Sequence, residues 1–187
     1  MTWLAVVFGL RMLMQARRTG DTGLRHRRNS RVELVAQLLL GVSVLAVGIL
    51  APIAGMAGLA PVLDGTGFVG IVLVVAGTAV TLAGQLGMGE SWRIGVDPNE
   101  RTALVTGGLF GLARNPVFSA AVVTSVGIAL MVGNVVALAG VVCLLIALEL
   151  QVRRVEEPYL RRVHGAEYAS YAARVGRFVP GIGRVRA

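Results

Sequence analysis

The chain has little cysteine, histidine or charge. Only 15% of its 187 residues are charged, whereas ordinary soluble chains have about 25%. One cysteine excludes a disulfide scaffold and a thiolate metal cluster, and two histidines argue against a histidine-rich metal site, so we expect no metal. Hydrophobic residues make up 55% of the chain, which excludes a disordered chain and a soluble globular domain. The composition predicts a small integral membrane protein.

Lysine is absent as well, so all 18 basic residues are arginines and the formal net charge is +8. A sequence pI near 11.3 is also found in nucleic-acid-binding proteins. In a membrane protein, however, arginines set the topology and contact anionic lipid headgroups. We therefore expect a bilayer and no nucleic acid as partner. The wealth of Arg, Ala, Val and Gly is typical of a GC-rich bacterial genome.

Long apolar runs predict the spans. They are Leu34 to about Met56, Phe68 to Met88, and Pro116 to Leu150. One span needs about 20 apolar residues, and the third run has 35. Gly133-Asn134 interrupts it, and these residue types tolerate left-handed turn geometry. We therefore expect an all-α multi-pass transmembrane bundle of about four spans, the last two forming a tight helical hairpin.

The arginines predict the topology of these spans. They fall into three segments, with seven in 11–31, three in 90–115 and eight after Leu150. The remaining connections, 57–67 and the Gly133-Asn134 turn, contain none. By the positive-inside rule, both termini and the 90–115 segment lie in the cytoplasm. We therefore divide the chain into three parts. These are a basic N-terminal segment (1–33) with an interfacial helix within Trp3–Met14, a transmembrane bundle (34–150) and a cytoplasmic helical tail (151–187).

One stripe of glycines lies in the first predicted span. Gly41, Gly48 and Gly55 recur every seven residues, so they share one side of a helix. Small residues let helices approach closely in lipid, where no hydrophobic effect drives them together. We expect this stripe to pack against another helix.

Polar residues near the spans gather in 84–93, 106–118 and 149–171, all on the predicted cytoplasmic side. There they can converge on one pocket at the membrane surface. One helix face carries four charged residues whose sequence positions, counted from the first, are 0, 4, 7 and 8. They are Glu149, Arg153, Glu156 and Glu157. This face is either an exposed ladder of ion pairs or an acidic pair that holds a cationic or hydroxyl-rich ligand. Pro158 predicts a kink directly after it.

Several other side chains have two interpretations. Asn115-Pro116 can cap the third run. Arg114 is either a snorkelling anchor or a clamp for a ligand carboxylate. Tyr168 and Tyr171 either anchor the chain at the interface or line a pocket. Gly87-Met88-Gly89 either packs or permits close approach of a ligand.

Taken together, these residues form an ordered series around the predicted hairpin. The series is Gly107-Gly108, Arg114-Asn115-Pro116-Val117-Phe118, Glu156-Glu157-Pro158-Tyr159, His164-Gly165-Ala166-Glu167-Tyr168-Ala169-Ser170-Tyr171 and Arg177-Phe178-Val179-Pro180. It resembles the membrane methyltransferases of the isoprenylcysteine carboxyl methyltransferase and phospholipid methyltransferase superfamily. The resemblance extends from Gly84 to Pro180, roughly half of the chain.

This resemblance implies an S-adenosylmethionine-dependent methyltransferase that acts on a lipophilic or lipid acceptor, with the cofactor held by the tail. The implied cofactor-binding residues are Gly87, Gly89, Gly107, Asn115, Pro116, Glu156, Glu157, Tyr168 and Tyr171. The implied catalytic residues are Arg114, Asn115 and Arg153. Arg114 or Arg153 would orient an acceptor carboxylate or phosphate, and Glu156 or Glu157 would take the proton of an amine acceptor.

Two positions depart from the family pattern, in which a histidine stands at Asn115 and a tyrosine at Phe118. Asparagine keeps the hydrogen bonding of histidine but does not titrate near neutral pH, so we do not expect a base there. Asn-Pro also resembles the phosphatidylethanolamine N-methyltransferase version of the motif, which favours a lipid acceptor. Two alternatives remain: an NADPH-dependent enzyme resembling sterol reductases, and a non-catalytic membrane scaffold of the same fold.

Overall fold

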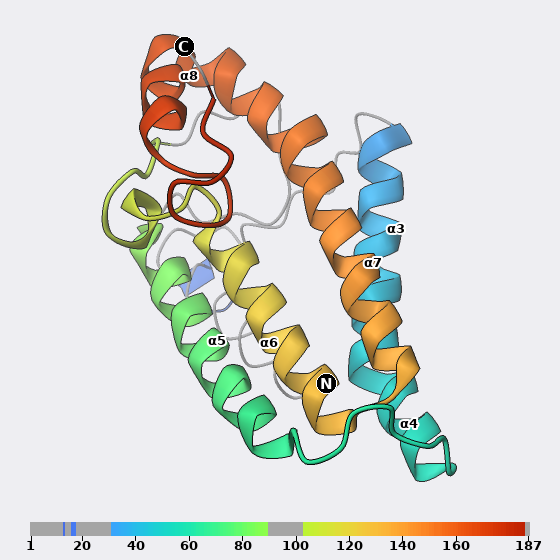
Figure 1. The fold of residues 1–187 in the computed structure, drawn as a ribbon. Coiled ribbons are helices and arrows are strands. Elements are labelled where there is room, and N and C mark those ends of the chain that lie inside the picture. Colours follow the sequence, from blue (N-terminus) through green and yellow to red (C-terminus); the bar gives the residue numbers. More distant parts are fainter. Residues whose placement is uncertain (1–12, 14–15, 18–30, 90–102, 186–187) are drawn as a thin grey trace.

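The computed structural model describes residues 13, 16–17, 31–89 and 103–185, and within these ranges it contains helices and no strand. The helices are α3 (Arg31–Leu45), η2 (Ala46–Leu50), α4 (Ala51–Met56), α5 (Gly67–Gly87), η4 (Gly108–Gly111), α6 (Pro116–Val132), α7 (Val135–Gln151), η5 (Val152–Glu156) and α8 (Glu157–Arg174) (Figure 1). The interfacial helix predicted within Trp3–Met14 lies outside the described residues apart from Leu13.

Three helices are long and apolar enough to cross a membrane. They are Arg31–Met56, Gly67–Gly87 and the apolar part of the helix that starts at Val135. α6 is a shorter apolar helix of 17 residues. Large side chains such as Phe68 and Val75 remain exposed on these helices, as expected for a surface that faces lipid. The predicted all-helical, multi-pass bundle is thus confirmed, and its apolar helices begin within three residues of the predicted positions.

The helices pack in two main pairs, α5 along α6 and α3 along α7. In the first pair, Gly70, Gly77 and Gly84 bring α5 close to α6. A Cβ on Gly70 would lie 2.5 Å from the carbonyl oxygen of Gly127, and one on Gly77 would overlap the Thr124 hydroxyl. This is the close approach that small residues allow between helices in lipid.

The glycine stripe predicted in the first span was the wrong one. A Cβ on Gly41 or Gly48 would meet no atom within 4 Å, and one on Gly55 would meet only the Asn134 amide nitrogen at 3.7 Å. Both stripes have the same seven-residue spacing. The difference comes from the rotation of each helix about its axis, which is set by its neighbours.

The predicted turn at Gly133-Asn134 is confirmed. Gly133 is left-handed (φ 72°), and its carbonyl oxygen accepts hydrogen bonds from the amides of Val62 and Leu63 at 2.8 and 3.1 Å. The Asn134 side chain caps α7 by accepting from the Ala137 amide at 3.1 Å and donates to the Ala51 carbonyl at 2.8 Å. Asn134 therefore joins the hairpin turn to the first helix inside a fully buried environment. Away from this turn, α6 and α7 diverge (Figure 1).

Both π-helical turns directly precede a proline. The Ala51 amide bonds to the Ala46 carbonyl before Pro52, and the Glu157 amide bonds to the Val152 carbonyl before Pro158. A proline has no N–H and clashes with the preceding turn, and a π turn widens the helix there. The helix thus continues through Pro158, and its sharp break comes later, at Gly165 (φ 51°, ψ −122°).

The packing of α5 on α6 predicts a stability difference between two glycine variants. Gly77→Val should lower the free energy of unfolding by about 1–3 kcal/mol, because the added methyl groups overpack the contact with Thr124. Gly41→Val adds the same atoms where the space is open and is the matched control. Unfolding in detergent can be followed through the reaction of Cys143, the only cysteine, with a fluorogenic thiol reagent. Equal destabilisation of both variants would contradict this account.

Candidate functional site

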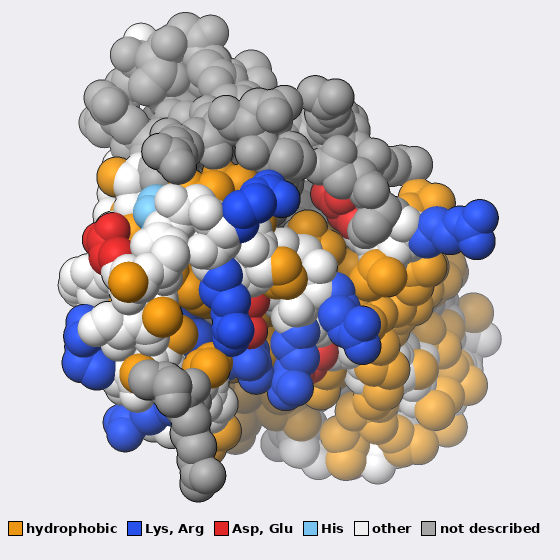
Figure 2. Space-filling view, turned by 90° about the horizontal axis from the view of Figure 1, so that it is seen from above, with side chains coloured by type: hydrophobic (Ala, Val, Ile, Leu, Met, Phe, Trp, Pro, Cys, Tyr) orange, Lys and Arg blue, Asp and Glu red, His pale blue; other side chains and the backbone are white. Residues whose placement is uncertain are grey.

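The polar end of the molecule is built by α8 and a loop that we call the C-terminal strap (residues 175–185). This loop runs beside the segment that leads into α6, where Ala113 and Gly176 form a parallel bridge. The amides of Arg114 and Asn115 donate to the carbonyls of Gly176 and Arg177 at 2.8 and 3.0 Å. Figure 2 looks onto this end and shows basic and acidic side chains gathered on it.

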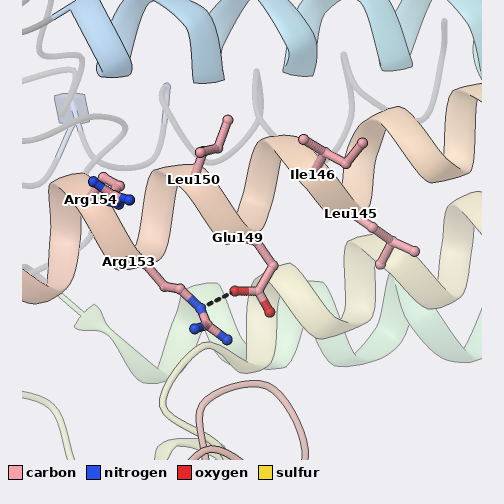
Figure 3. Close-up of a pocket in the computed structure, with 6 residues that line it drawn as sticks. All are labelled: Leu145, Ile146, Glu149, Leu150, Arg153 and Arg154. Carbon is pink, nitrogen blue, oxygen red and sulfur yellow. Dashed lines mark hydrogen bonds and ion pairs between the residues drawn. The ribbon is translucent and has the colours of Figure 1, made fainter.

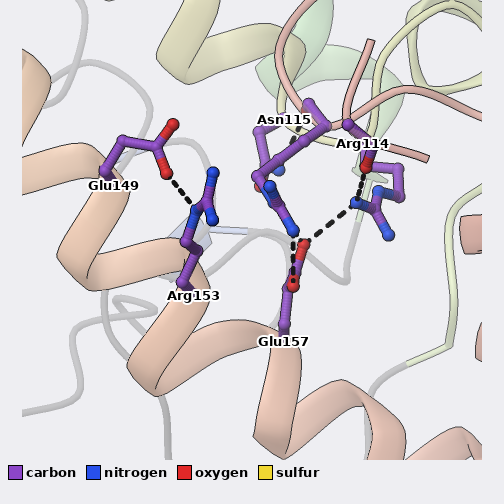
Figure 4. Close-up of polar contacts among 7 residues, drawn as sticks. Arg114, Asn115, Glu149, Arg153 and Glu157 are labelled. Carbon is purple, nitrogen blue, oxygen red and sulfur yellow. Dashed lines mark hydrogen bonds and ion pairs between the residues drawn. The ribbon is translucent and has the colours of Figure 1, made fainter. Parts of the chain in front are cut away.

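A buried ion triad lies beneath the strap. Glu157 Oε1 accepts from Arg114 Nη2 at 3.0 Å and from Arg177 Nε at 2.7 Å, and Glu157 Oε2 accepts from Arg177 Nη2 at 3.1 Å (Figure 4). The side chains of Arg114, Glu157 and Arg177 are 2%, 8% and 13% exposed. The bond to the Glu157 carboxylate raises the pKa of Arg177. The triad joins the start of α8, the approach to α6 and the strap.

Further bonds from the start of α6 hold the strap. Asn115 Nδ2 donates to the Arg177 carbonyl at 3.1 Å, and the Ser119 hydroxyl donates to the Phe178 carbonyl at 2.6 Å. Arg114 Nη2 also donates to the Gly183 carbonyl at 3.0 Å. Asn115 does stand at the N-cap position of α6, but its side chain makes no capping bond to the helix. Its amide is used to bind the strap instead.

The two tyrosines are buried beside the triad. Their rings pack edge to face with centroids 6.2 Å apart, and the guanidinium carbon of Arg114 lies 5.9 Å from the centre of the Tyr168 ring. The Tyr171 hydroxyl donates to the Phe110 carbonyl at 2.6 Å. Burial raises the pKa of Tyr168, and raises that of Tyr171 to about 12, so both stay neutral at physiological pH. The tyrosines lie within this cluster rather than at an exposed membrane interface.

The two adjacent glutamates have different hydrogen-bond partners, and in this sense the acidic pair is divided. Glu157 is held by the triad, whereas Glu156 accepts only one bond, from Gln151 Nε2 at 3.3 Å, among the contacts of the described residues. Glu156 lies beyond the apolar part of its helix, and desolvation raises its pKa to about 7, against the opposing effect of the Gln151 bond. Adjacent residues of a helix point about 100° apart, so Glu156 and Glu157 reach different partners.

One ion pair of the predicted ladder forms. Arg153 Nε bonds to Glu149, and both side chains are about half exposed. Glu157, however, pairs with Arg114 and Arg177 and not with the ladder partners Arg153 and Arg161 expected from their spacing. The Glu149–Arg153 pair borders an open groove of about 440 Å³ (Figure 3). Its lining residues are Leu145, Ile146, Glu149, Leu150, Arg153 and Arg154.

A second cavity, of about 330 Å³, lies where the end of α5 meets η4. Its lining residues are Ala83, Gly84, Gly87, Val105, Gly107, Gly108, Leu109 and Phe110. A Cβ on Gly87 or Gly107 would meet no atom of the described residues within 4 Å, so these residues leave the backbone there open to a ligand. Phe110 connects this cavity to the tyrosines through its bond with Tyr171. Gly89 (φ 54°) follows α5 but is not a lining residue.

The structure therefore places the expected site residues in four different surroundings. Arg114, Asn115, Glu157, Tyr168 and Tyr171 form one cluster, and the buried Pro116 begins α6 beside it. Gly87 and Gly107 line the cavity next to this cluster, while Arg153 lies at the open groove and Glu156 near Gln151.

Arg177, Gly183 and Gln85 were missed by sequence reasoning. Arg177 stands three residues before Pro180 in the closing motif, which was the available signal for it. Gly183 contributes only a backbone carbonyl, for which the sequence carries no signal. Gln85 is a buried polar residue within an apolar helix, and such residues mark functional sites in membrane proteins.

Arg114 is only partly satisfied by these contacts. Its Nε and Nη1 atoms are buried and have no hydrogen-bond partner within the part of the chain that the structure describes, although buried donors are nearly always bonded. These donors suit a ligand carboxylate or phosphate oxygen. Among the groups that S-adenosylmethionine carries, its carboxylate would fit these two donors.

The chain matches a known protein family. The family described as phospholipid methyltransferase matches residues 66–167, which is more than half of the chain. This range contains α5, the cavity, Arg114, both hairpin helices and the acidic pair. The strap with Arg177 lies outside it. No curated protein matches the chain.

The divided acidic pair predicts opposite effects for two isosteric substitutions. Glu157→Gln should destabilise the protein by about 3–5 kcal/mol, because it leaves two buried arginines without their counter-charge. Glu156→Gln should be neutral or stabilising above pH 7, because it removes a carboxylate whose charged form is disfavoured by burial. Thermal unfolding of both variants at pH 8 measures the difference. A Glu156→Gln variant as unstable as Glu157→Gln would overturn the division.

Proposed function

Because this chain belongs to the phospholipid methyltransferase family, we propose that it transfers a methyl group from S-adenosylmethionine to a lipid or lipophilic acceptor in the membrane. The observation that carries this proposal is the overlap between the family match and the site. The matched residues 66–167 include the glycine-lined cavity, the buried Arg114 with its two unpaired donors, and Glu156. The family match favours methyl transfer over the reductase alternative.

The orientation in the membrane is part of the proposal. The arginine-rich segments support a cytoplasmic location for the polar end and for both termini. The cofactor, a cytoplasmic metabolite, would then reach the cavity from the aqueous side. The open groove along α7 combines the apolar Leu145, Ile146 and Leu150 with Arg153 and Arg154. This combination suits the acyl chain and anionic head of a lipid entering from the bilayer.

Methyl transfer of this kind is an in-line displacement. The acceptor atom forms a bond to the methyl carbon, the carbon–sulfur bond breaks with its electron pair remaining on sulfur, and the acceptor loses a proton. When bound, S-adenosylmethionine supplies a methyl group that is already activated. The protein therefore contributes mainly alignment and exclusion of water.

The residues of the site would divide these tasks. Gly87 and Gly107 leave room for the cofactor in the cavity. Arg114 Nε and Nη1 would bind a carboxylate or phosphate oxygen, and Glu157 and the strap hold this guanidinium in place. Glu156, with its pKa raised to about 7, would accept the proton of an amine acceptor. Asn115, which does not titrate, would serve positioning only.

Cofactor binding can be tested with a variant that fills the cavity. Gly107 has φ −92° and ψ 172° and no neighbour within 4 Å of its Cβ position, so Gly107→Val should fold normally while occupying ligand space. In calorimetry on the detergent-purified chain, wild type should bind S-adenosylmethionine and its demethylated product. Gly107→Val should bind them at least about tenfold more weakly, equivalent to about 1.4 kcal/mol, and Gly41→Val should bind as wild type does.

NADPH is the second ligand in this calorimetric test. Binding of NADPH but of neither sulfur compound by a folded sample would overturn the methyltransferase proposal in favour of the reductase. Absence of binding by all three ligands would favour the scaffold.

The proposed role of Glu156 predicts a pH profile. With an amine-bearing lipid as acceptor, methyl transfer should rise as the pH increases through about 7, because only deprotonated Glu156 can take the proton. Glu156→Gln should lose this limb and most of the rate. Glu167→Gln removes one carboxylate from an exposed position of α8 and should keep the profile. An unchanged profile in Glu156→Gln would exclude this residue as the base.

A further inference from the structure

Gln85 in α5 is a fully buried polar side chain that the cofactor and triad contacts do not use. Its exposed fraction is 0%, and neither its amide oxygen nor its amide nitrogen has a hydrogen-bond partner among the described residues. The buried hydroxyls of the same helix pair behave differently. Thr81 donates to the Gly77 carbonyl at 2.8 Å, and Thr124 to the Ala120 carbonyl at 3.0 Å, each within its own helix. Gln85 thus differs from these two threonines, which form hydrogen bonds within their own helices, and from buried polar groups in general, which nearly always have a partner.

The position of Gln85 places it at the polar end. It lies in the last turn of α5, next to Gly84, which packs against Val117 in the first turn of α6. Arg114 and Asn115 directly precede that turn. An unsatisfied amide in an apolar membrane helix is unfavourable unless a ligand completes it, and Gln85 lies at the end of α5 that carries the glycine-lined cavity.

The direction of the side chain separates Gln85 from the cofactor cavity. Ala83 and Gly87, two residues to either side, line that cavity, whereas Gln85 does not. A helix turns by about 100° per residue, so residues two apart lie on nearly opposite sides. Gln85 therefore faces away from the cavity that the glycines line.

The chemistry of the amide indicates the kind of group. Glutamine is neutral and offers one acceptor oxygen and an NH₂ donor. It therefore suits a group that carries an N–H or O–H beside an oxygen. A quaternary ammonium lacks such a donor and would leave the Gln85 oxygen unpaired.

We propose that Gln85 recognises the headgroup of the lipid acceptor, with Gln85 Oε1 accepting an N–H or O–H from the headgroup and Nε2 donating to a headgroup oxygen. Gln85 then determines specificity for lipids that carry such a donor. That the recognised lipid is the methyl acceptor rests on the proposed function. The recognition of the lipid by Gln85 can be measured without methyl transfer.

The test uses the full chain in detergent and three lipid probes. Phosphatidylethanolamine carries an N–H donor, phosphatidylglycerol carries O–H donors, and phosphatidylcholine carries neither. Wild type should be stabilised more by phosphatidylethanolamine or phosphatidylglycerol than by phosphatidylcholine in thermal unfolding followed through Cys143. The lipid that stabilises more distinguishes an amine from a hydroxyl headgroup.

Gln85→Leu should respond to all three lipids alike. Without lipid its Tm should be about 2–4 °C above that of wild type, because a buried unpaired amide has been removed. Thr81→Val is the matched control, since Thr81 is equally buried one turn earlier but already bonded; it should keep the lipid preference. A preference that persists in Gln85→Leu, or a wild type that does not distinguish the lipids, would overturn the inference.

Calorimetry with S-adenosylhomocysteine, the demethylated product, separates this inference from the proposed function. Gln85→Leu should bind it as wild type does, and a tenfold loss would assign Gln85 to the cofactor and overturn the headgroup role. A wild type that distinguishes the lipids through Gln85 but binds no sulfur compound would refute methyl transfer and leave the headgroup role standing.

Discussion

The buried carboxylate of Glu157 joins three segments that are far apart in the chain. It receives hydrogen bonds from Arg114, which precedes α6, and from Arg177 in the strap, while its own backbone begins α8. A carboxylate and two guanidinium groups can be buried together only if each retains its partners. This constraint fixes the strap against the start of α6, and with it the orientation of Arg114 and the tyrosines. The polar end of the molecule thus depends on this triad.

The opposite end is held by a neutral polar cross-link. Asn134 caps α7 and bonds to the first helix, and the left-handed Gly133 accepts two amides from the connection before α5. Between the two ends the helices are apolar, so close approach of α5 and α6 relies on glycines and on van der Waals contact. α6 and α7 diverge from the hairpin turn toward the polar end, where Glu157 connects α8 to the start of α6.

This arrangement separates stability from the proposed chemistry. Glu157 is used to hold the structure, whereas its neighbour Glu156 is desolvated and has only one bond from the described residues, to Gln151. The Arg114 side chain has both a structural part and a part left for a ligand. Nη2 is bonded within the protein, whereas Nε and Nη1 have no partner among the described residues. Buried polar groups without partners are unfavourable for folding, so their presence at Arg114 and Gln85 is most simply explained by binding.

The sequence by itself determined the spans, the hairpin turn and the gathering of charged groups, because these depend on local composition. Apolar length predicts spanning helices, and Gly133-Asn134 interrupts the third run with residue types that tolerate left-handed turn geometry. The family of the chain was also evident from the order of its motifs. The tertiary structure alone decided which glycine stripe packs and which of two adjacent glutamates is buried. It also decided that Arg177 completes an ion triad and that Gln85 has no partner. The physical reason is the rotation of each helix about its axis. Neighbouring helices and the π turn before Pro158 set which side of a helix faces inward. The spacing of residues along the sequence does not determine this rotation.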